Sequence, residues 1–281
     1  MIQWLKQAEN PTIARFIECY WFIEKDQAAG SEPFPQLNPD PSAHLMLSPS
    51  KQFYGYQSKD VVYEGRGSHW IFPHSETFIL DHSKPFQHLG IKFHAGALYS
   101  LVIPEYSHPS LNSVSSLGLS HLQASLKMDE TMLLKLAQTD SQGCVEQLDS
   151  LLMPWLVGIE QDKHSELSQK ALLLLDSSNI ADLGERLFCS QRTLERSFAR
   201  VTGLSLKQVQ SMNKLEALLE YLYQRGVAEL DWVDIAYRFG FSDQPHLIRH
   251  LKKQIGLTPK RYAEQRGLTI DVYGGVAANK R

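Results

Sequence analysis

The sequence of 281 residues predicts an α+β protein of two domains, a β-rich N-terminal half followed by an entirely helical C-terminal half. Three observations predict it: short aromatic and β-branched runs in the first hundred residues, a helix-turn-helix pattern that occurs twice after residue 178, and an unequal division of charge. The polar segment GIEQDKHSE at 158–166 is the expected linker between the domains.

The overall charge of −3 conceals a difference between the two halves. Residues 167–281 contain 17 Lys and Arg against 12 Asp and Glu, whereas residues 1–166 contain 11 against 19. Only the C-terminal half is therefore suited by charge to binding a polyanion such as DNA.

The first hundred residues read as short strands separated by proline and glycine clusters, which favours a β-sandwich or β-barrel. The expected strands lie at 14–24, 44–48, 52–57, 60–67, 69–73, 76–82 and 87–94. A proline-rich loop spans 31–42, and a short helix at 95–102 is expected to close the barrel.

Apolar residues recur at steps of three and four between residues 121 and 157, which predicts two amphipathic helices with a break near Ser141. These helices form a helical arm that completes an effector or dimerisation domain at 1–157. Their apolar face has two possible partners, the barrel or a second subunit.

The segment from Asp231 to Pro259 predicts a helix, a tight turn and a second helix. Asp231 is suited to cap the first helix, and Gly240 stands where the chain needs a left-handed φ to leave it. Ser242 or Asp243 can cap the second helix. One face of that helix is apolar, with residues four apart: Leu247, Leu251 and Ile255.

The same pattern occurs upstream, so one supersecondary unit is used twice. Five residues of the first copy recur 52 positions later: Asn179, Asp182, Leu183, Arg186 and Ser190 match Asp231, Asp234, Ile235, Arg238 and Ser242. After the turn, the offset is 53. A helical pattern at 206–224 joins the copies, so that 167–267 forms one DNA-binding domain, followed by a tail at 268–281.

The stretch from Ser168 to roughly Gln265 resembles the double helix-turn-helix domain of the AraC/XylS family of bacterial transcription regulators. The residues IAYRFGFSDQPHLIRHLKKQIGLTPKRY at 235–262 carry the resemblance, and LFCSQRTLERSFARVTGLS at 187–205 is the less distinctive first copy. Pro245 departs from the polar residue often found there, which puts one base contact in doubt. The family's recognition positions fall on Arg192, Glu195, Arg196, Gln244, His246 and Arg249.

The chemistry of these side chains suits base readout, because Arg pairs with guanine, Gln with adenine, and Glu accepts from cytosine. Basic residues further along each helix are expected to contact phosphates. The candidate DNA-binding residues are Gln191, Arg192, Glu195, Arg196, Arg200, Gln244, His246, Arg249, His250 and Lys253. Four further residues are expected to contact only phosphates: Lys207, Lys252, Lys260 and Arg261.

The N-terminal half resembles, more weakly, the cupin-like sensory domain of such regulators, chiefly in GIKFHAGALYSLV at 90–102. The resemblance implies an effector pocket inside the barrel, a homodimer, and activation through RNA polymerase more often than repression. Aromatic residues such as Tyr54 and Tyr56 either line that pocket or form ordinary core. Two alternatives remain open: control by a protein partner, and a metal-dependent cupin enzyme fused to a DNA-binding domain.

Nine of the eleven histidines precede residue 167, yet no His-x-His pair of a metal cupin occurs. We therefore expect no metal, no cofactor and no enzymatic activity. Three widely spaced cysteines suggest no disulfide framework, and no apolar run or leader pattern suggests a membrane. A bacterial cytoplasmic regulator is the expectation. The nine histidines are His44, His69, His74, His82, His88, His94, His108, His121 and His164.

Overall fold

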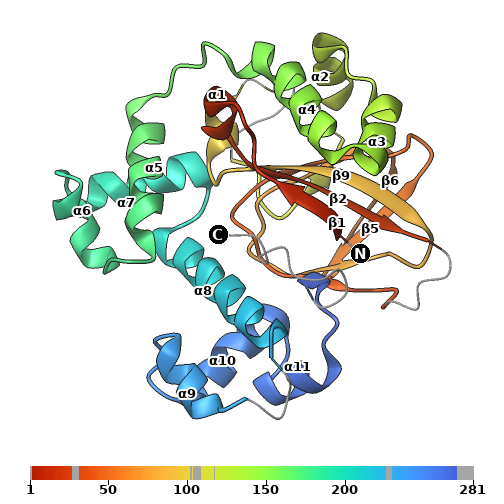
Figure 1. Cartoon of the computed structure of the whole chain (residues 1–281). Coiled ribbons are helices and arrows are strands. Elements are labelled where there is room, and N and C mark those ends of the chain that lie inside the picture. Colours follow the sequence, from red (N-terminus) through yellow and green to blue (C-terminus); the bar gives the residue numbers. More distant parts are fainter. Residues whose placement is uncertain are drawn as a thin grey trace.

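The chain forms the two domains that the sequence predicts (Figure 1). The computed structural model describes residues 2–26, 32–101, 103, 109–116, 118–225 and 230–270. Every strand of these ranges lies in the first 115 residues, and beyond residue 118 the described regular structure is helical. The α+β class is confirmed.

The N-terminal domain is built on two antiparallel sheets. The larger has the strand order β1-β2-β9-β4-β7-β10 and the smaller β3-β8-β5-β6. Their strands are β1 Ile2–Lys6, β2 Ile17–Lys25, β3 Gln36–Leu37, β4 His44–Leu47, β5 Phe53–Ser58, β6 Val61–Arg66, β7 His69–Ile71, β8 Phe78–Leu80, β9 Phe86–Phe93 and β10 Val114–Ser115.

Two N-terminal expectations are corrected by local backbone chemistry. The strand expected at 14–24 begins only at Ile17, because a helical turn α1, Pro11–Ala14, precedes it. Asn10 caps that turn by accepting from the Thr12 N–H, and proline suits its first position. The helix expected at 95–102 is a 3₁₀ turn, η1 Ala97–Ser100; Val102 lies outside the described residues.

Between residues 118 and 158, all of which the structure describes, three helices form rather than the two expected. They are α2 Leu119–Leu126, α3 Glu130–Thr139 and α4 Ser141–Leu156. Asp129 and Asp140 each cap a new helix, so the chain restarts twice. The apolar face packs on the larger sheet, where Leu133 and Leu148 share one core with Phe93. Of the two expected partners, the barrel and a second subunit, the barrel therefore covers this face.

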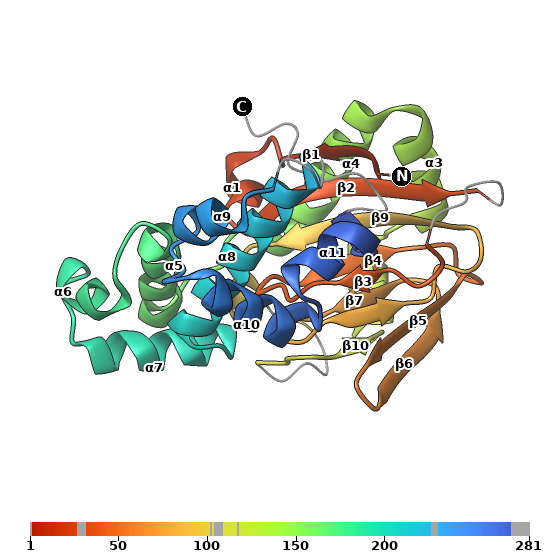
Figure 2. The same ribbon diagram turned by 90° about the horizontal axis from the view of Figure 1, so that it is seen from below.

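The C-terminal domain consists of short helices around a long connector, α8 (Figure 2). Its elements are α5 Lys163–Leu175, η2 Ile180–Asp182, α6 Leu183–Arg186, α7 Gln191–Thr202, α8 Leu206–Tyr223, α9 Trp232–Arg238, α10 Gln244–Ile255 and α11 Pro259–Gln265.

The expected linker and tail are both shorter in the structure. Residues 163–166 of the linker belong to α5, because Asp162 caps that helix by accepting from the N–H groups of His164 and Ser165. Leu268, placed in the tail by sequence, is fully buried and forms a bridge with Gln36 of β3. Residues 271–281 of the expected tail lie outside the described residues.

Candidate nucleic-acid interface

The two helix-turn-helix units have recognition helices of the same length, 12 residues, in α7 and α10. Ser190 caps the first and Asp243 the second, which decides between the two caps possible for α10. Each helix ends at a glycine, Gly203 or Gly256, with φ 72° and ψ −2°. The repeat in the sequence is thus a repeat in local backbone chemistry.

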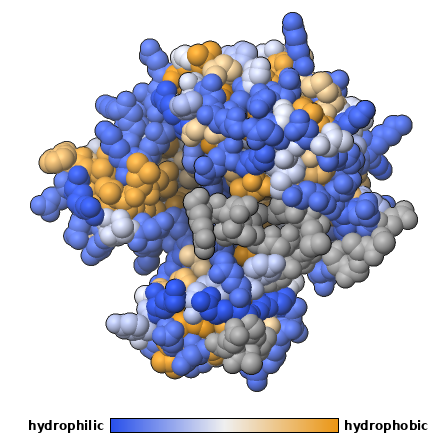
Figure 3. All heavy atoms as spheres, in the orientation of Figure 1, coloured by the Kyte–Doolittle hydropathy of each residue, from blue (hydrophilic) through white to orange (hydrophobic). Residues whose placement is uncertain are grey.

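The turns of the two units differ at one matched position. Gly240 has φ 63°, the left-handed conformation that its place in the pattern predicts. Phe188 occupies that position in the first unit with φ 55°, and its side chain is 97% exposed. Leu173 of α5 is also exposed, at 84%. Figure 3 shows an apolar surface over α5 and α6.

The first recognition helix exposes a stripe of arginines. Arg192, Arg196 and Arg200 are four residues apart and all exposed, so they share one helix face. Glu195 is also exposed and accepts from the Gln191 amide at 3.0 Å. The Gln191 carbonyl oxygen in turn accepts from the Gly184 N–H of α6 at 3.3 Å, so Gln191 joins the two helices of the unit.

The second recognition helix exposes Arg249 and Lys253 in the same way. His246 is exposed, and its Nδ1 lies 3.2 Å from the Ser242 hydroxyl across the start of the helix. Gln244 is half-buried. His246, Arg249 and Lys253 offer imidazole and cationic groups along one outer face, which Gln244 does not share.

His250 occupies a different environment from the other candidates. Its ring packs 5.1 Å from that of Phe241, and its buried Nε2 has no hydrogen-bond partner among the described residues. Burial, then the charges of Lys214 and the neighbouring basic side chains, lowers the pKa of His250 to about 4. At neutral pH this side chain is an uncharged packing group.

Lys214 of α8 supports the second unit, a role that sequence reasoning did not assign. Its ammonium donates to the Gly240 carbonyl at 3.0 Å and lies 3.7 Å from the centroid of the Phe241 ring. Since Phe241 also contacts His246 and His250, Lys214 links the connector helix to the second recognition helix. Spacing in the sequence gives no signal for this contact, because the residues are distant along the chain.

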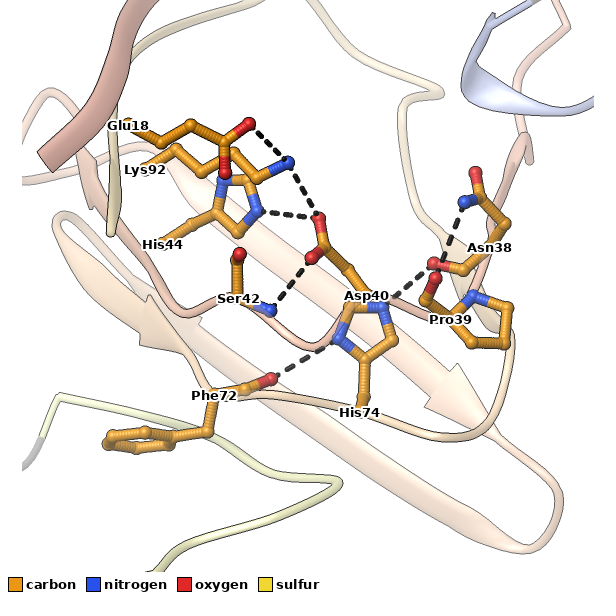
Figure 4. A network of polar contacts seen from close by, with 9 residues as sticks. All are labelled: Glu18, Asn38, Pro39, Asp40, Ser42, His44, Phe72, His74 and Lys92. Carbon is orange, nitrogen blue, oxygen red and sulfur yellow. Dashed lines mark hydrogen bonds and ion pairs between the residues drawn. The ribbon is translucent and has the colours of Figure 1, made fainter. Parts of the chain in front are cut away.

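A second polar cluster lies in the N-terminal domain and centres on Asp40 (Figure 4). Its carboxylate is 3.1 Å from His44 Nε2 and 3.5 Å from the Lys92 ammonium, which also lies 3.3 Å from Glu18. Burial alone would raise the pKa of Asp40, but Lys92 and His44 hold it well below its usual range. Asp40 is therefore a largely buried, charged group that contacts both His44 and Lys92.

The histidines behave mainly as structural groups. Four of them, His69, His74, His82 and His88, are buried, and burial lowers the pKa of each below its ordinary value. His108 lies outside the described residues. Across the described ranges, no three His, Cys, Asp or Glu side chains are grouped so as to hold a metal ion.

Comparison with known proteins agrees with this geometry. Residues 183–265 match the family described as "Helix-turn-helix domain", and residues 9–107 match "Domain of unknown function (DUF6597)". No protein with a curated description matches the chain.

Solved structures that match the chain include an apo variant of ToxT from Vibrio cholerae strain SCE256, with 12% identity, a TM-score of 0.47, and coverage of 87% of this chain and 97% of that one. The C-terminal domain of AraT, a response regulator from Geobacillus stearothermophilus, has 22% identity and a TM-score of 0.34 over 38% and 92%. The AraC-like transcriptional activator CuxR has 13% identity and a TM-score of 0.26 over 70% and 73%.

The duplicated unit, its caps and the helix-turn-helix match define a double helix-turn-helix DNA-binding protein. With the motif at 235–262, they show a helix-turn-helix domain of the AraC/XylS type at residues 183–265. Among the described helices, none has the length and apolar character needed to cross a membrane.

Proposed function

We propose that this regulator reads two DNA half-sites with α7 and α10 while its N-terminal domain controls how the two helices are presented. One observation carries the proposal: the N-terminal domain contacts both units, at separate points. The Thr77 hydroxyl donates to the Gln254 carbonyl at the end of α10 at 2.6 Å. The Arg200 guanidinium of α7 donates to the Tyr99 hydroxyl at 2.7 Å.

The segment that follows α11 strengthens the attachment of the second unit. The Gln36 N–H of β3 donates to the Gly267 carbonyl at 2.9 Å, and the buried Leu268 belongs to the core of that unit. A charge on the connector helix also acts on the N-terminal domain. Burial alone would lower the pKa of Lys92, but the charges of Asp40 and then of Glu216 on α8 raise it. A change within the barrel can therefore reach both helix-turn-helix units through direct contacts.

Base contacts are proposed for Arg192, Glu195 and Arg196 in the first unit, and for Gln244, His246 and Arg249 in the second. The exposure of the arginines and their common face support this assignment. Arg200 and Lys253 are proposed to contact phosphates, and Gln191 to orient Glu195. His250 is proposed to support DNA binding indirectly, because its ring packs against Phe241 and holds α10 in place.

Control by an effector follows as a population shift. An effector that prefers one docking arrangement biases the paired readers by its difference in affinity for the two states, and DNA biases effector binding by the same factor. By family resemblance, the outcome is activation through RNA polymerase contact in the bacterial cytoplasm. A homodimer would use surfaces other than the apolar face of α2–α4, which the barrel already covers.

A protein effector is the second candidate, and the packing between the sheets favours it over a small molecule. The Tyr54 and His69 rings lie 3.8 Å apart, and the Tyr56 ring is 5.4 Å from His69. These rings, with Phe78, occupy the space between the smaller and larger sheets.

Selection of duplexes from a random pool by the full-length protein, at two salt concentrations, tests the proposal. Two short motifs about one helical turn, or ~34 Å, apart should be enriched, with affinity falling steeply as salt rises. Enrichment of a single motif would refute reading by both units. Binding without any enrichment would refute base readout.

A further inference from the structure

The first recognition helix meets the N-terminal domain through an ordered chain of hydrogen bonds. Arg200 Nε donates to the Tyr99 hydroxyl at 2.7 Å, and that hydroxyl donates to Asp162 Oδ2 at 3.2 Å. The single hydroxyl thus accepts from a cation and donates to a carboxylate, which is the favourable order of charge. The guanidinium carbon also lies 5.9 Å from the Tyr99 ring centroid.

Asp162 is held in place independently of Tyr99. Its other oxygen, Oδ1, accepts from the backbone N–H groups of His164 at 3.0 Å and Ser165 at 2.8 Å, as the cap of α5. Although burial opposes the change, hydrogen bonds from Ser165, Tyr99 and His164 lower the pKa of Asp162. The acceptor of the Tyr99 proton is therefore an ionised carboxylate fixed at a helix start.

The backbones around this contact are closely packed. A Cβ on Gly96, which precedes η1, would lie 2.7 Å from Val201 Cγ1, and one on Gly203 would lie 2.8 Å from Pro109. Both glycines have a positive φ, of 78° and 72°. Since neither position has room for a side chain, η1 and the end of α7 hold a defined distance, and Tyr99 reaches Arg200 in a fixed geometry.

Arg200 remains available to a ligand in this arrangement. It is exposed, and its two terminal amino groups have no hydrogen-bond acceptor among the described residues. It lies on the same face as Arg192 and Arg196, about two turns beyond the first and one turn beyond the second. Because the N-terminal residues of a recognition helix enter the groove, a side chain at this distance is suited to a phosphate.

We propose that Tyr99 is a positioning residue for DNA binding, which holds Arg200 by Nε so that its terminal amino groups are oriented toward a DNA phosphate. The N-terminal domain thereby contributes to DNA affinity without touching DNA. The benefit arises from preorganisation, because a free arginine side chain loses more rotamer freedom on binding than one already held. The inference rests on the proposed contact between Arg200 and phosphate.

The test measures dissociation constants of full-length variants over a range of salt, with a duplex enriched by the wild-type protein. Arg200→Ala should weaken binding about five- to tenfold and make the salt dependence shallower by about 0.9 in log–log slope, the loss of one phosphate contact. Tyr99→Phe keeps the ring and should weaken binding about two- to fourfold, with a smaller decrease in slope. In the Arg200→Ala background, Tyr99→Phe should have no further effect.

Tyr223→Phe is the matched control, since the Tyr223 hydroxyl on α8 has no hydrogen bond within the described residues; its binding should equal that of the wild type. If Arg200→Ala changes nothing, the proposed phosphate contact fails. If Arg200→Ala weakens binding but Tyr99→Phe does not, only the positioning role fails. Tighter binding by Tyr99→Phe would also overturn positioning, because it would mean that Tyr99 restrains Arg200 from binding DNA. So would an equal loss of affinity in the wild-type and Arg200→Ala backgrounds, because it would indicate a general structural effect.

Discussion

The two helix-turn-helix units have equal recognition helices with equivalent caps, but they are supported differently. The first contacts the N-terminal domain through the Arg200 side chain, a candidate DNA ligand. The second does so through backbone carbonyls, those of Gln254 and Gly267, while Lys214 of the connector supports its turn. Local sequence thus determines the unit, whereas its surroundings determine which side chains are tied to the N-terminal domain.

The largest effects should come from removing the matched core residues of each unit. Phe198 and Leu251 occupy equivalent positions and are fully buried. Phe198→Ala should lower the free energy of unfolding by about 3–5 kcal/mol and Leu251→Ala by about 2–5 kcal/mol, measured by urea denaturation.

Each core variant should also lose enrichment of one DNA motif and keep the other. Leu173→Ala is the control, because this side chain is 84% exposed and its removal should change stability by less than about 0.5 kcal/mol. Loss of both motifs in either variant would mean that the units fold and read as one body.

Matched arginines test whether the units read different bases. Arg196→Ala and Arg249→Ala should each weaken specific binding by about 1–3 kcal/mol and relax the preference at one base, in different half-sites. Lys253→Ala should weaken binding to selected and random duplexes alike. An equal loss on both kinds of duplex for Arg249→Ala would refute its role in base readout.

Acid should weaken the second unit more than the first, because only the second buries a histidine in its recognition helix. The pKa of His250 falls to about 4 on folding from an ordinary value of 6.5, so the unfolded chain binds the proton more tightly. The stabilisation is complete above the ordinary value and is lost as pH falls toward 4. Solvent screening of this partly exposed ring reduces the effect, so between about pH 7 and about pH 5 we expect a loss of about 1 kcal/mol.

Hydrogen exchange of α10 against α7 is the measurement for this difference. His250→Gln removes the titration, so its α10 should lose less protection on acidification than that of the wild type. His121→Gln, at an exposed position of α2, should follow the wild type. Equal acid sensitivity of α10 in the wild type and His250→Gln would exclude His250 as the cause.

The smallest effects concern the matched turn position. Gly240→Ala should cost about 1 kcal/mol, since an added Cβ finds open space apart from Lys214 Nζ at 3.9 Å and only the left-handed backbone opposes it. Phe188→Asn should gain about 0.5 kcal/mol, because asparagine adopts a positive φ more readily. Urea denaturation of both variants checks that the free energy of unfolding falls for Gly240→Ala and rises for Phe188→Asn. A destabilised Phe188→Asn would show that contacts of the exposed ring offset the strain of its backbone.

Where the cause is local, sequence reasoning located elements closely. The glycine at 240 and the acid at 231 determine where α9 ends and begins, and both act within one helical turn. Where the cause lies far away in the sequence, sequence reasoning was wrong or gave no signal. The apolar spacing of α2–α4 showed a face to be buried but not what covers it, and nothing near Tyr99 indicated Arg200.

By itself, the sequence determined the class of this protein, because caps, apolar spacing and the duplicated motif act over a few residues and survive in any tertiary context. Only the tertiary structure decided which candidates remain exposed, that His250 is a packing group, and that both readers are attached to the barrel. Those properties depend on contacts between distant residues, such as Thr77 and Gln254, which are 177 positions apart, and one-dimensional spacing does not encode them.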